Sequence, residues 1–144
     1  MISADQLRDR LQAVPLFARC HPSDLQIVAE RSSIRSVDAG TELVRAGTEG
    51  DEFFVLLEGT AEVRRNGEIG GKLEAGDHFG ELALLDPAPR SADVVMTSDG
   101  AVSVLTRTNF KLVLEAVPGV APELMAFLAR RLRVADAPEP NEEL

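Results

Sequence analysis

The sequence predicts a mainly β fold, a sandwich or barrel of short strands with helices at both ends of the chain. Between Ser33 and Thr106, glycines at positions 40, 47, 50, 59, 67, 76, 80 and 100 divide the chain into short segments rich in Val, Leu, Ile and Phe. Short apolar segments separated by regular turns are typical of sandwiches and barrels. On either side of this region, apolar residues recur at helical spacing instead.

Two short helices are expected before the strands. Ser3 and Gln6 have the spacing of a capping box, which predicts a helix start at the beginning of the chain. Apolar residues then follow at helical spacing until Pro15, and they are Leu7, Leu11 and Val14. A second helix is predicted from Pro22, with Asp24 in its first turn.

Local signals also divide the rest of the chain. Asn66-Gly67 predicts a two-residue hairpin turn between strands. After Thr106, a helical stripe begins at Phe110 and breaks at Pro118-Gly119. Pro122 is expected to open a last helix, whose stripe is Leu124, Leu128 and Leu132. We therefore expect one domain over residues 1–137 and an acidic, proline-containing disordered tail over residues 138–144.

Composition narrows the possible functions. The formal net charge of −9 over 144 residues argues against a nucleic-acid-binding face. No long apolar run or leader-like segment is present in this sequence, so we expect no membrane association. A single cysteine favours a reduced, cytoplasmic setting, and two distant histidines argue against a metal site.

Residues 79–94 carry the strongest functional signal. Gly80 predicts a tight turn, and the residues after it predict one or two turns of helix over 80–85, ended by Pro87. A helix start offers unpaired N–H groups to an anion, and Arg90 can supply a two-pronged guanidinium to the same anion. Glu81 repels phosphate but can accept hydrogen bonds from sugar hydroxyls. The combination suits a sugar phosphate that carries a single charge.

This segment closely resembles the phosphate-binding cassette of cyclic nucleotide-binding domains. The family pattern F-G-E-[LIV]-A-L, a short gap and P-R-[STA]-A-x-V matches residues 79–94 without an insertion. Weaker resemblance extends over about residues 5–135 and includes the turn Gly50-Asp51-Glu52-Phe53. The resemblance implies a jelly-roll-like double-stranded β-helix barrel with flanking helices.

The resemblance also implies the ligand and the residues that bind it. The ligand is expected to be cyclic AMP, with cyclic GMP possible because Ser91 after the arginine does not discriminate between them. Asp51 is expected to orient Arg90 from behind, and Val63 to line the base pocket. The residues expected to bind the ligand directly are Gly80, Glu81, Leu82, Ala83, Arg90, Ser91 and Ala92.

No nucleophile–base pair or acid pair stands out, so we expect a regulatory protein and not an enzyme. The overall pattern is similar to bacterial activators, but Pro138 and Pro140 stop the last helix where those proteins continue into a DNA-reading region. We therefore expect a stand-alone cyclic nucleotide-binding protein that signals in trans to an effector protein. Inward movement of the cassette would re-pack Leu84 or Leu85 against the helix at Phe110 and shift the last helix.

Three alternatives remain open. The barrel could be a protein-interaction module whose degenerate pocket binds no nucleotide. It could be a cupin-like metalloenzyme, which shares the double-stranded β-helix, although histidines are scarce here. It could also act on DNA through another chain.

Overall fold

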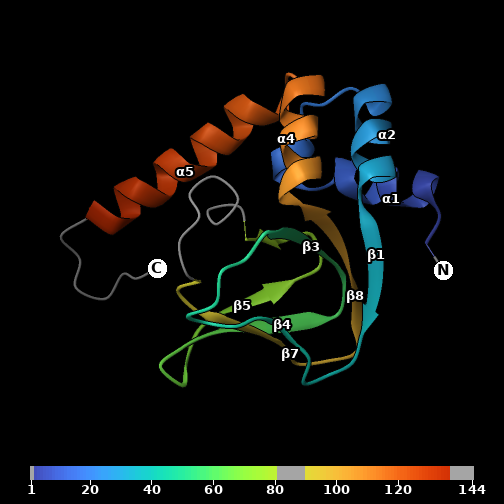
Figure 1. Ribbon diagram of the computed structural model, residues 1–144. Coiled ribbons are helices and arrows are strands. Elements are labelled where there is room, and N and C mark those ends of the chain that lie inside the picture. Colours follow the sequence, from blue (N-terminus) through green and yellow to red (C-terminus); the bar gives the residue numbers. More distant parts are fainter. Residues whose placement is uncertain (1, 81–89, 137–144) are drawn as a thin grey trace.

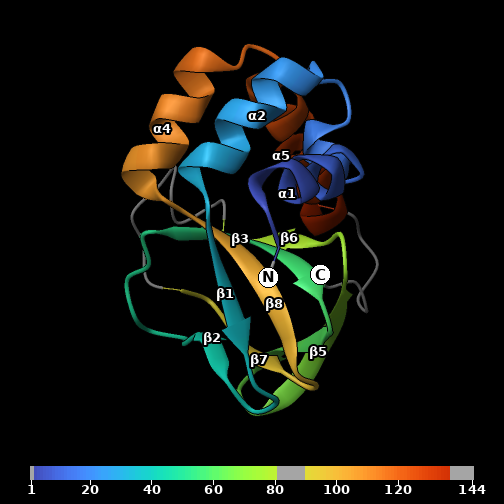
Figure 2. The same ribbon diagram turned by 90° about the vertical axis from the view of Figure 1, so that its right-hand side faces the viewer.

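Two four-stranded antiparallel sheets face each other, and the helices gather at one end of them (Figures 1 and 2). The computed structural model describes residues 2–80 and 90–136 of the 144-residue chain. The first sheet has the strand order β1 (Ser33–Val37), β8 (Gly100–Thr106), β3 (Glu52–Glu58) and β6 (His78–Phe79). The second has the order β2 (Glu42–Val44), β7 (Asp93–Met96), β4 (Thr60–Arg65) and β5 (Glu68–Glu74). The expected mainly β jelly-roll architecture is confirmed, with the described strands in two sheets instead of one closed barrel.

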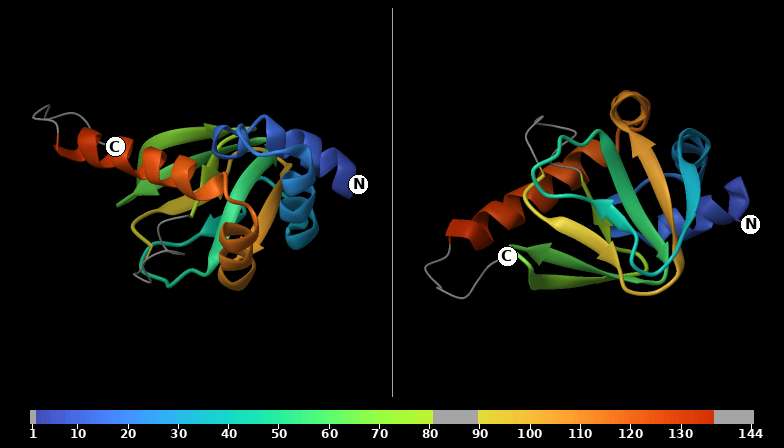
Figure 3. Two further views of the ribbon diagram at one scale, coloured as in Figure 1. Left: turned by 90° about the horizontal axis from the view of Figure 1, so that it is seen from above. Right: turned by 60° about the horizontal axis from the view of Figure 1, so that its bottom comes forward.

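The helices lie before and after the strands in the chain, as the periodicity predicts. They are α1 (Ala4–Gln12), the 3₁₀ helix η1 (Pro15–Phe17), α2 (Pro22–Arg31), α4 (Arg107–Ala116) and α5 (Val120–Asp136). Seen from above, α5 runs from α4 away from the N-terminus (Figure 3). No single helix among the described residues is long and apolar enough to cross a membrane. Helices α4 and α5 taken together have the length and composition of a membrane-spanning segment, but the chain bends sharply between them.

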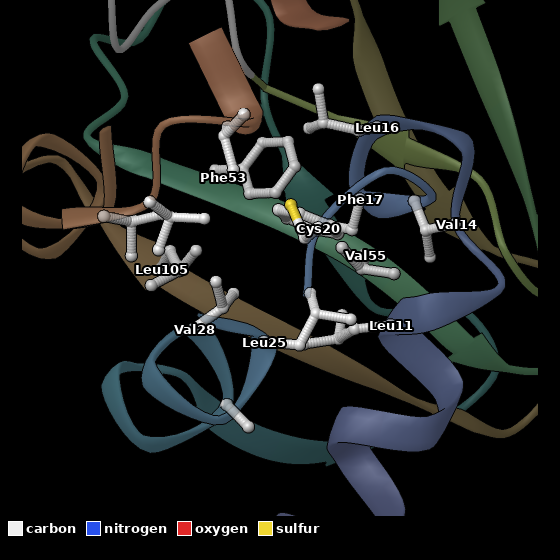
Figure 4. Close-up of a cluster of buried hydrophobic side chains, with 14 of the residues drawn as sticks. Leu11, Val14, Leu16, Phe17, Cys20, Leu25, Val28, Phe53, Val55 and Leu105 are labelled. Carbon is white, nitrogen blue, oxygen red and sulfur yellow. The ribbon is translucent and has the colours of Figure 1, made fainter. Parts of the chain in front are cut away.

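Strand β3 contributes to both hydrophobic cores because its side chains alternate between two covered faces. Phe53, Val55 and Leu57 pack with the helices, together with residues such as Phe17, Leu25 and Phe110 (Figure 4). Phe54 and Leu56 point the other way and pack between the two sheets. Both faces of β3 are buried, which explains its uninterrupted apolar run. The strand is therefore a platform on which the helices and the second sheet meet.

The local signals for the first helix and the hairpin are confirmed. The Ser3 hydroxyl accepts the Gln6 N–H at 3.1 Å, and the Gln6 side chain accepts the Ser3 N–H at 2.8 Å. Asn66 and Gly67 have φ angles of 54° and 80°, and Arg65 pairs with Glu68 across the turn. These are the two left-handed residues of a two-residue hairpin loop.

The start of the last helix differs from the prediction. Helix α5 begins at Val120 and not at Pro122, which lies in its first turn. The first N–H groups of a helix have no partner inside it, so a proline is tolerated there without being the first residue. Val120 and Leu124 are buried, and this burial against the core fixes the start of the helix. The expected interruption at 80–85, the tail at 138–144 and the side chain of Leu132 lie outside the described residues.

Cys20 is a packing residue of the core between the helices and β3 (Figure 4). It is 6% exposed, and burial, aided by Asp24 and Glu123, raises the pKa of its thiol. A raised pKa keeps the thiol protonated at neutral pH and therefore poorly nucleophilic.

Replacing Ser3 with alanine should lower the free energy of unfolding by about 0.5–2 kcal/mol, because α1 loses its cap. Urea denaturation followed by circular dichroism measures the change. Ser23→Ala, at an exposed serine in the first turn of α2, is the matched control and should change stability much less. Equal effects of the two substitutions would contradict a specific role for the capping box.

Candidate functional site

The guanidinium of Arg90 is held by two backbone carbonyl groups. Its Nη2 donates to the carbonyl oxygen of Glu52 at 2.9 Å, and its Nη1 donates to that of Gly80 at 3.3 Å. Glu52 begins β3, Gly80 directly follows β6, and Arg90 precedes β7. The half-buried side chain therefore links Gly80 and residue 90 itself to the start of β3, a strand with five buried residues in a row.

Two glycines leave room for this side chain. A Cβ at Gly50 would lie only 2.0–2.2 Å from the Nε, Cζ and Nη2 atoms of Arg90. A Cβ at Gly80 would lie 2.7 Å from the Glu52 carbonyl oxygen and 3.1 Å from Arg90 Nη1. Gly80 also has a φ of +95°, which a side chain would strain. A larger residue at position 50 would displace the guanidinium, and one at position 80 would displace the Glu52 carbonyl oxygen that binds it.

The backbone of Arg90 is fixed as well. Its N–H donates to the carbonyl oxygen of Thr48 at 2.8 Å, and its own carbonyl accepts the Gly47 N–H at 2.9 Å. Strand-like pairing with the turn after β2 thus fixes the Cα of Arg90, while the hydrogen bonds to the Glu52 and Gly80 carbonyls fix its guanidinium. An arginine restrained at both ends loses little additional side-chain entropy when a ligand binds.

Arg90 also lines a hollow of about 220 Å³. Asp51 lines it together with Arg90 and is exposed, so the structure brings these two sequence-predicted residues to one place. The described hydrogen bonds of Arg90 go to carbonyl oxygens, and the expected orienting role of the Asp51 carboxylate stays a prediction. The full lining is Glu42, Leu43, Val44, Arg45, Thr48, Glu49, Gly50, Asp51, Glu52 and Arg90.

Two of the carboxylates in this lining have ion-pair partners. Glu42 binds Arg45 at 2.8 Å, a contact that raises the pKa of the arginine through its hydrogen bond and charge. Glu52 forms an ion pair with Arg35 of β1. These pairs reduce the negative potential that the lining would otherwise place beside Arg90.

The other sequence-predicted residues lie at different depths. Ser91 is exposed, whereas Ala92 is buried at the start of β7. Val63 is half-buried on β4 and packs against the core between the sheets, so it belongs to the second sheet. Glu81, Leu82 and Ala83 lie outside the described residues. Over residues 2–80 and 90–136, no three His, Cys, Asp or Glu side chains could hold a metal ion together.

Sequence reasoning missed two parts of the Arg90 site. The Glu52 carbonyl could not be predicted from the type of residue, because every residue has a backbone carbonyl group. Arg107 was also missed: its Nη2 donates to the Gly50 carbonyl oxygen at 3.0 Å, and its N–H donates to that of Asp51 at 2.7 Å. The glycine at position 50 is a usable signal, although its role is space for a guanidinium and not only a turn.

Fold and site together define a jelly-roll domain in which an arginine, Arg90, is bonded to the carbonyl groups of Gly80 and Glu52. The family model for the cyclic nucleotide-binding domain matches residues 34–116, and the chain belongs to this family. The match covers the strands of both sheets and α4. The recognition made from residues 79–94 is therefore confirmed.

Known relatives agree with this assignment. The chain is 39% identical over 106 residues to a cAMP-dependent protein kinase regulatory subunit of Mycosarcoma maydis, a match covering 69% of this chain and 20% of that protein. It resembles the catabolite activator protein of Thermus thermophilus with a TM-score of 0.80 and 31% identity, over 85% of this chain and 60% of that one. It also resembles the regulatory domain of Toxoplasma gondii PKA crystallised with cAMP, with a TM-score of 0.77 and 28% identity, over 89% and 50%. The chain thus spans about a fifth of the first of these relatives.

Replacing Gly50 with alanine should displace the Arg90 guanidinium, since the new Cβ would overlap it. We expect the urea midpoint to fall and the side-chain NMR signals of Arg90 to shift. Gly71→Ala on β5 is the control, because nothing lies within 4 Å of a Cβ there. Arg90 signals that remained unchanged in Gly50→Ala would contradict the described packing.

Proposed function

We propose that this chain is a regulatory module that binds cyclic AMP through residues 80–92. Arg90 pairs with the cyclic phosphate, Glu81 accepts hydrogen bonds from the ribose, and Val63 lies toward the base. Membership of the cyclic nucleotide-binding family supports this proposal, as does the likeness to the Toxoplasma regulatory domain crystallised with cAMP. Gly80, Leu82, Ala83, Ser91 and Ala92 complete the proposed binding segment.

The observation that best supports the proposal is the set of contacts that restrains the Arg90 side chain. Its guanidinium donates hydrogen bonds to the carbonyl oxygens of Gly80 and Glu52. It also packs against Gly50 so closely that a Cβ there would overlap it. A surface arginine kept only for solubility needs neither the two carbonyl contacts nor the glycine. Such restraint is useful when a guanidinium must meet an anion at a fixed angle.

The expected free energy of the contact between Arg90 and the phosphate is consistent with the total binding free energy of a small nucleotide. A hydrogen bond that involves a charged group contributes about 1.5–3 kcal/mol. A ligand of roughly twenty heavy atoms at about 0.3 kcal/mol per atom gives −6 to −8 kcal/mol, a dissociation constant of about 1 to 40 µM. Arg90 would then supply about a fifth to a half of the total.

We further propose that the module is not an enzyme, and that it signals in the cytoplasm to an effector protein through α4 and α5. The contacts supply a route for such a signal. Arg90 binds the carbonyl of Glu52, and the ring of the next residue, Phe53, lies 5.5 Å from that of Phe110 on α4. A ligand that shifts Arg90 can therefore bias the position of α4, provided that its affinity differs between the two positions.

Titration of the purified chain with cyclic AMP by calorimetry should give a dissociation constant of about 1 to 40 µM. Arg90→Ala should weaken binding about 10- to 150-fold, because one charge-assisted contact is lost. Cyclic GMP, titrated in parallel, tests the preference for adenine.

Arg10→Ala is the matched control for this titration. Arg10 also donates to a backbone carbonyl of β3, but to that of Leu57, near the end of the strand opposite to Glu52. Its removal should change affinity less than threefold. If the wild-type chain bound neither nucleotide, the interaction-module hypothesis would replace this proposal.

Hydrogen exchange tests the signalling route separately from binding. Saturating cyclic AMP should change amide protection in α4 and α5, whereas α1, whose Arg10 contacts β3 at its other end through Leu57 and Glu58, should keep its protection. Unchanged protection in α4 and α5 at saturation would refute the proposed route and leave binding intact.

A further inference from the structure

Three consecutive carbonyl groups at the start of β3 each accept a hydrogen bond from an arginine. The Gly50 carbonyl binds Nη2 of Arg107 at 3.0 Å, and the Asp51 carbonyl binds the backbone N–H of Arg107 at 2.7 Å. The Glu52 carbonyl binds Nη2 of Arg90 at 2.9 Å. We call residues 50–52 the carbonyl turn. Two arginines that are distant in sequence thus meet on one short piece of backbone.

Both arginines contact Gly50. The Arg90 guanidinium lies against its Cα, where a Cβ would stand 2.0–2.2 Å away, and Arg107 holds its carbonyl oxygen. A rotation of the Gly50 peptide would therefore both lengthen the Arg107 bond and move the surface on which Arg90 rests. The two side chains are coupled through one residue, without needing to touch.

Arg107 is also the first residue of α4. The first N–H groups of a helix lack partners inside the helix, and the one at Arg107 is satisfied by Asp51. Side chain and backbone of Arg107 therefore join the start of α4 to the carbonyl turn at two points. The side chain is half-buried, which strengthens its contact relative to one in water.

We propose that Arg107 is a positioning residue for the nucleotide phosphate. It fixes the carbonyl turn, and the turn fixes the guanidinium of Arg90 at the angle that the phosphate requires. This inference rests on the proposed function, since it assigns a role in binding the same ligand. By linkage, an α4 position that loosens Arg107 lowers ligand affinity, and a bound ligand favours the position that keeps it.

The test compares Arg107→Met and Arg107→Lys with the wild-type chain. Methionine keeps the apolar stem but removes every donor, whereas lysine keeps the charge and one donor toward Gly50. The matched control is Arg10→Met, because Arg10 donates to the Leu57 carbonyl at 3.3 Å near the other end of β3 and also pairs with Glu58. Denaturation by urea confirms that each variant is folded.

Cyclic AMP and adenosine are titrated against each variant by NMR. Arg107→Met should weaken cyclic AMP binding about 2- to 30-fold, the range for residues that modulate a coupled site. Adenosine has no phosphate, so its affinity should stay unchanged, and Arg107→Lys should recover part of the loss. A merely structural role predicts equal losses for both ligands. Equal losses, or no loss for either, would overturn the proposal.

A second measurement needs no ligand. The Arg90 guanidinium signals, assigned by their disappearance in Arg90→Lys, should show slowed rotation in the wild-type chain and in Arg10→Met. In Arg107→Met the separate Arg90 guanidinium signals should merge into averaged ones, because the guanidinium rotates faster when the carbonyl turn no longer holds it in one orientation. Unchanged Arg90 signals would overturn the positioning role. If no nucleotide bound the wild-type chain, the proposed function would fail while these signals still decided whether Arg107 positions Arg90.

Discussion

The hydrogen bond between the Arg90 guanidinium and the Glu52 carbonyl is the contact on which the site depends. A half-buried guanidinium is costly unless its N–H groups have acceptors. Here the backbone supplies acceptors at Glu52 and Gly80, and these lie at the ends of two different strands. The position of the arginine is thus a consequence of strand pairing, and it is as well defined as the sheet itself.

Strand β3 is suited to this task because both of its faces are buried. It pairs with β8 along its length and with β6 near its start, and it contributes to the core under the helices and to the core between the sheets. Elements with many buried contacts open least often to solvent. A carbonyl at the start of such a strand is a stable reference point. Helix α4, which begins at Arg107, is hydrogen-bonded to the same turn through the Gly50 and Asp51 carbonyls.

The sequence predicts those parts of the molecule that depend on local chemistry. The capping box at Ser3, the hairpin at Asn66-Gly67 and the division into short strands are set by neighbours in the chain, and the structure shows all of them. The start of α5 was misplaced because burial of Val120 and not the local preference of Pro122 decides it. The described partners of Arg90 and Arg107 are backbone carbonyls that lie up to 57 positions away. Backbone carbonyls have no residue signature, so only the fold could reveal them.

An anion site in a chain of net charge −9 requires local compensation. Four acidic residues line the hollow beside Arg90, and at a few ångströms each could offset part of its attraction for phosphate. Glu42 and Glu52 are ion-paired with Arg45 and Arg35, so each arginine offsets much of the field of its carboxylate at distances greater than the separation within the pair. The carbonyl oxygens add only partial charges, which orient the guanidinium without neutralising it. Orientation by backbone dipoles and neutralisation of Glu42 and Glu52 by their ion pairs together let an acidic protein offer a phosphate one well-placed positive charge.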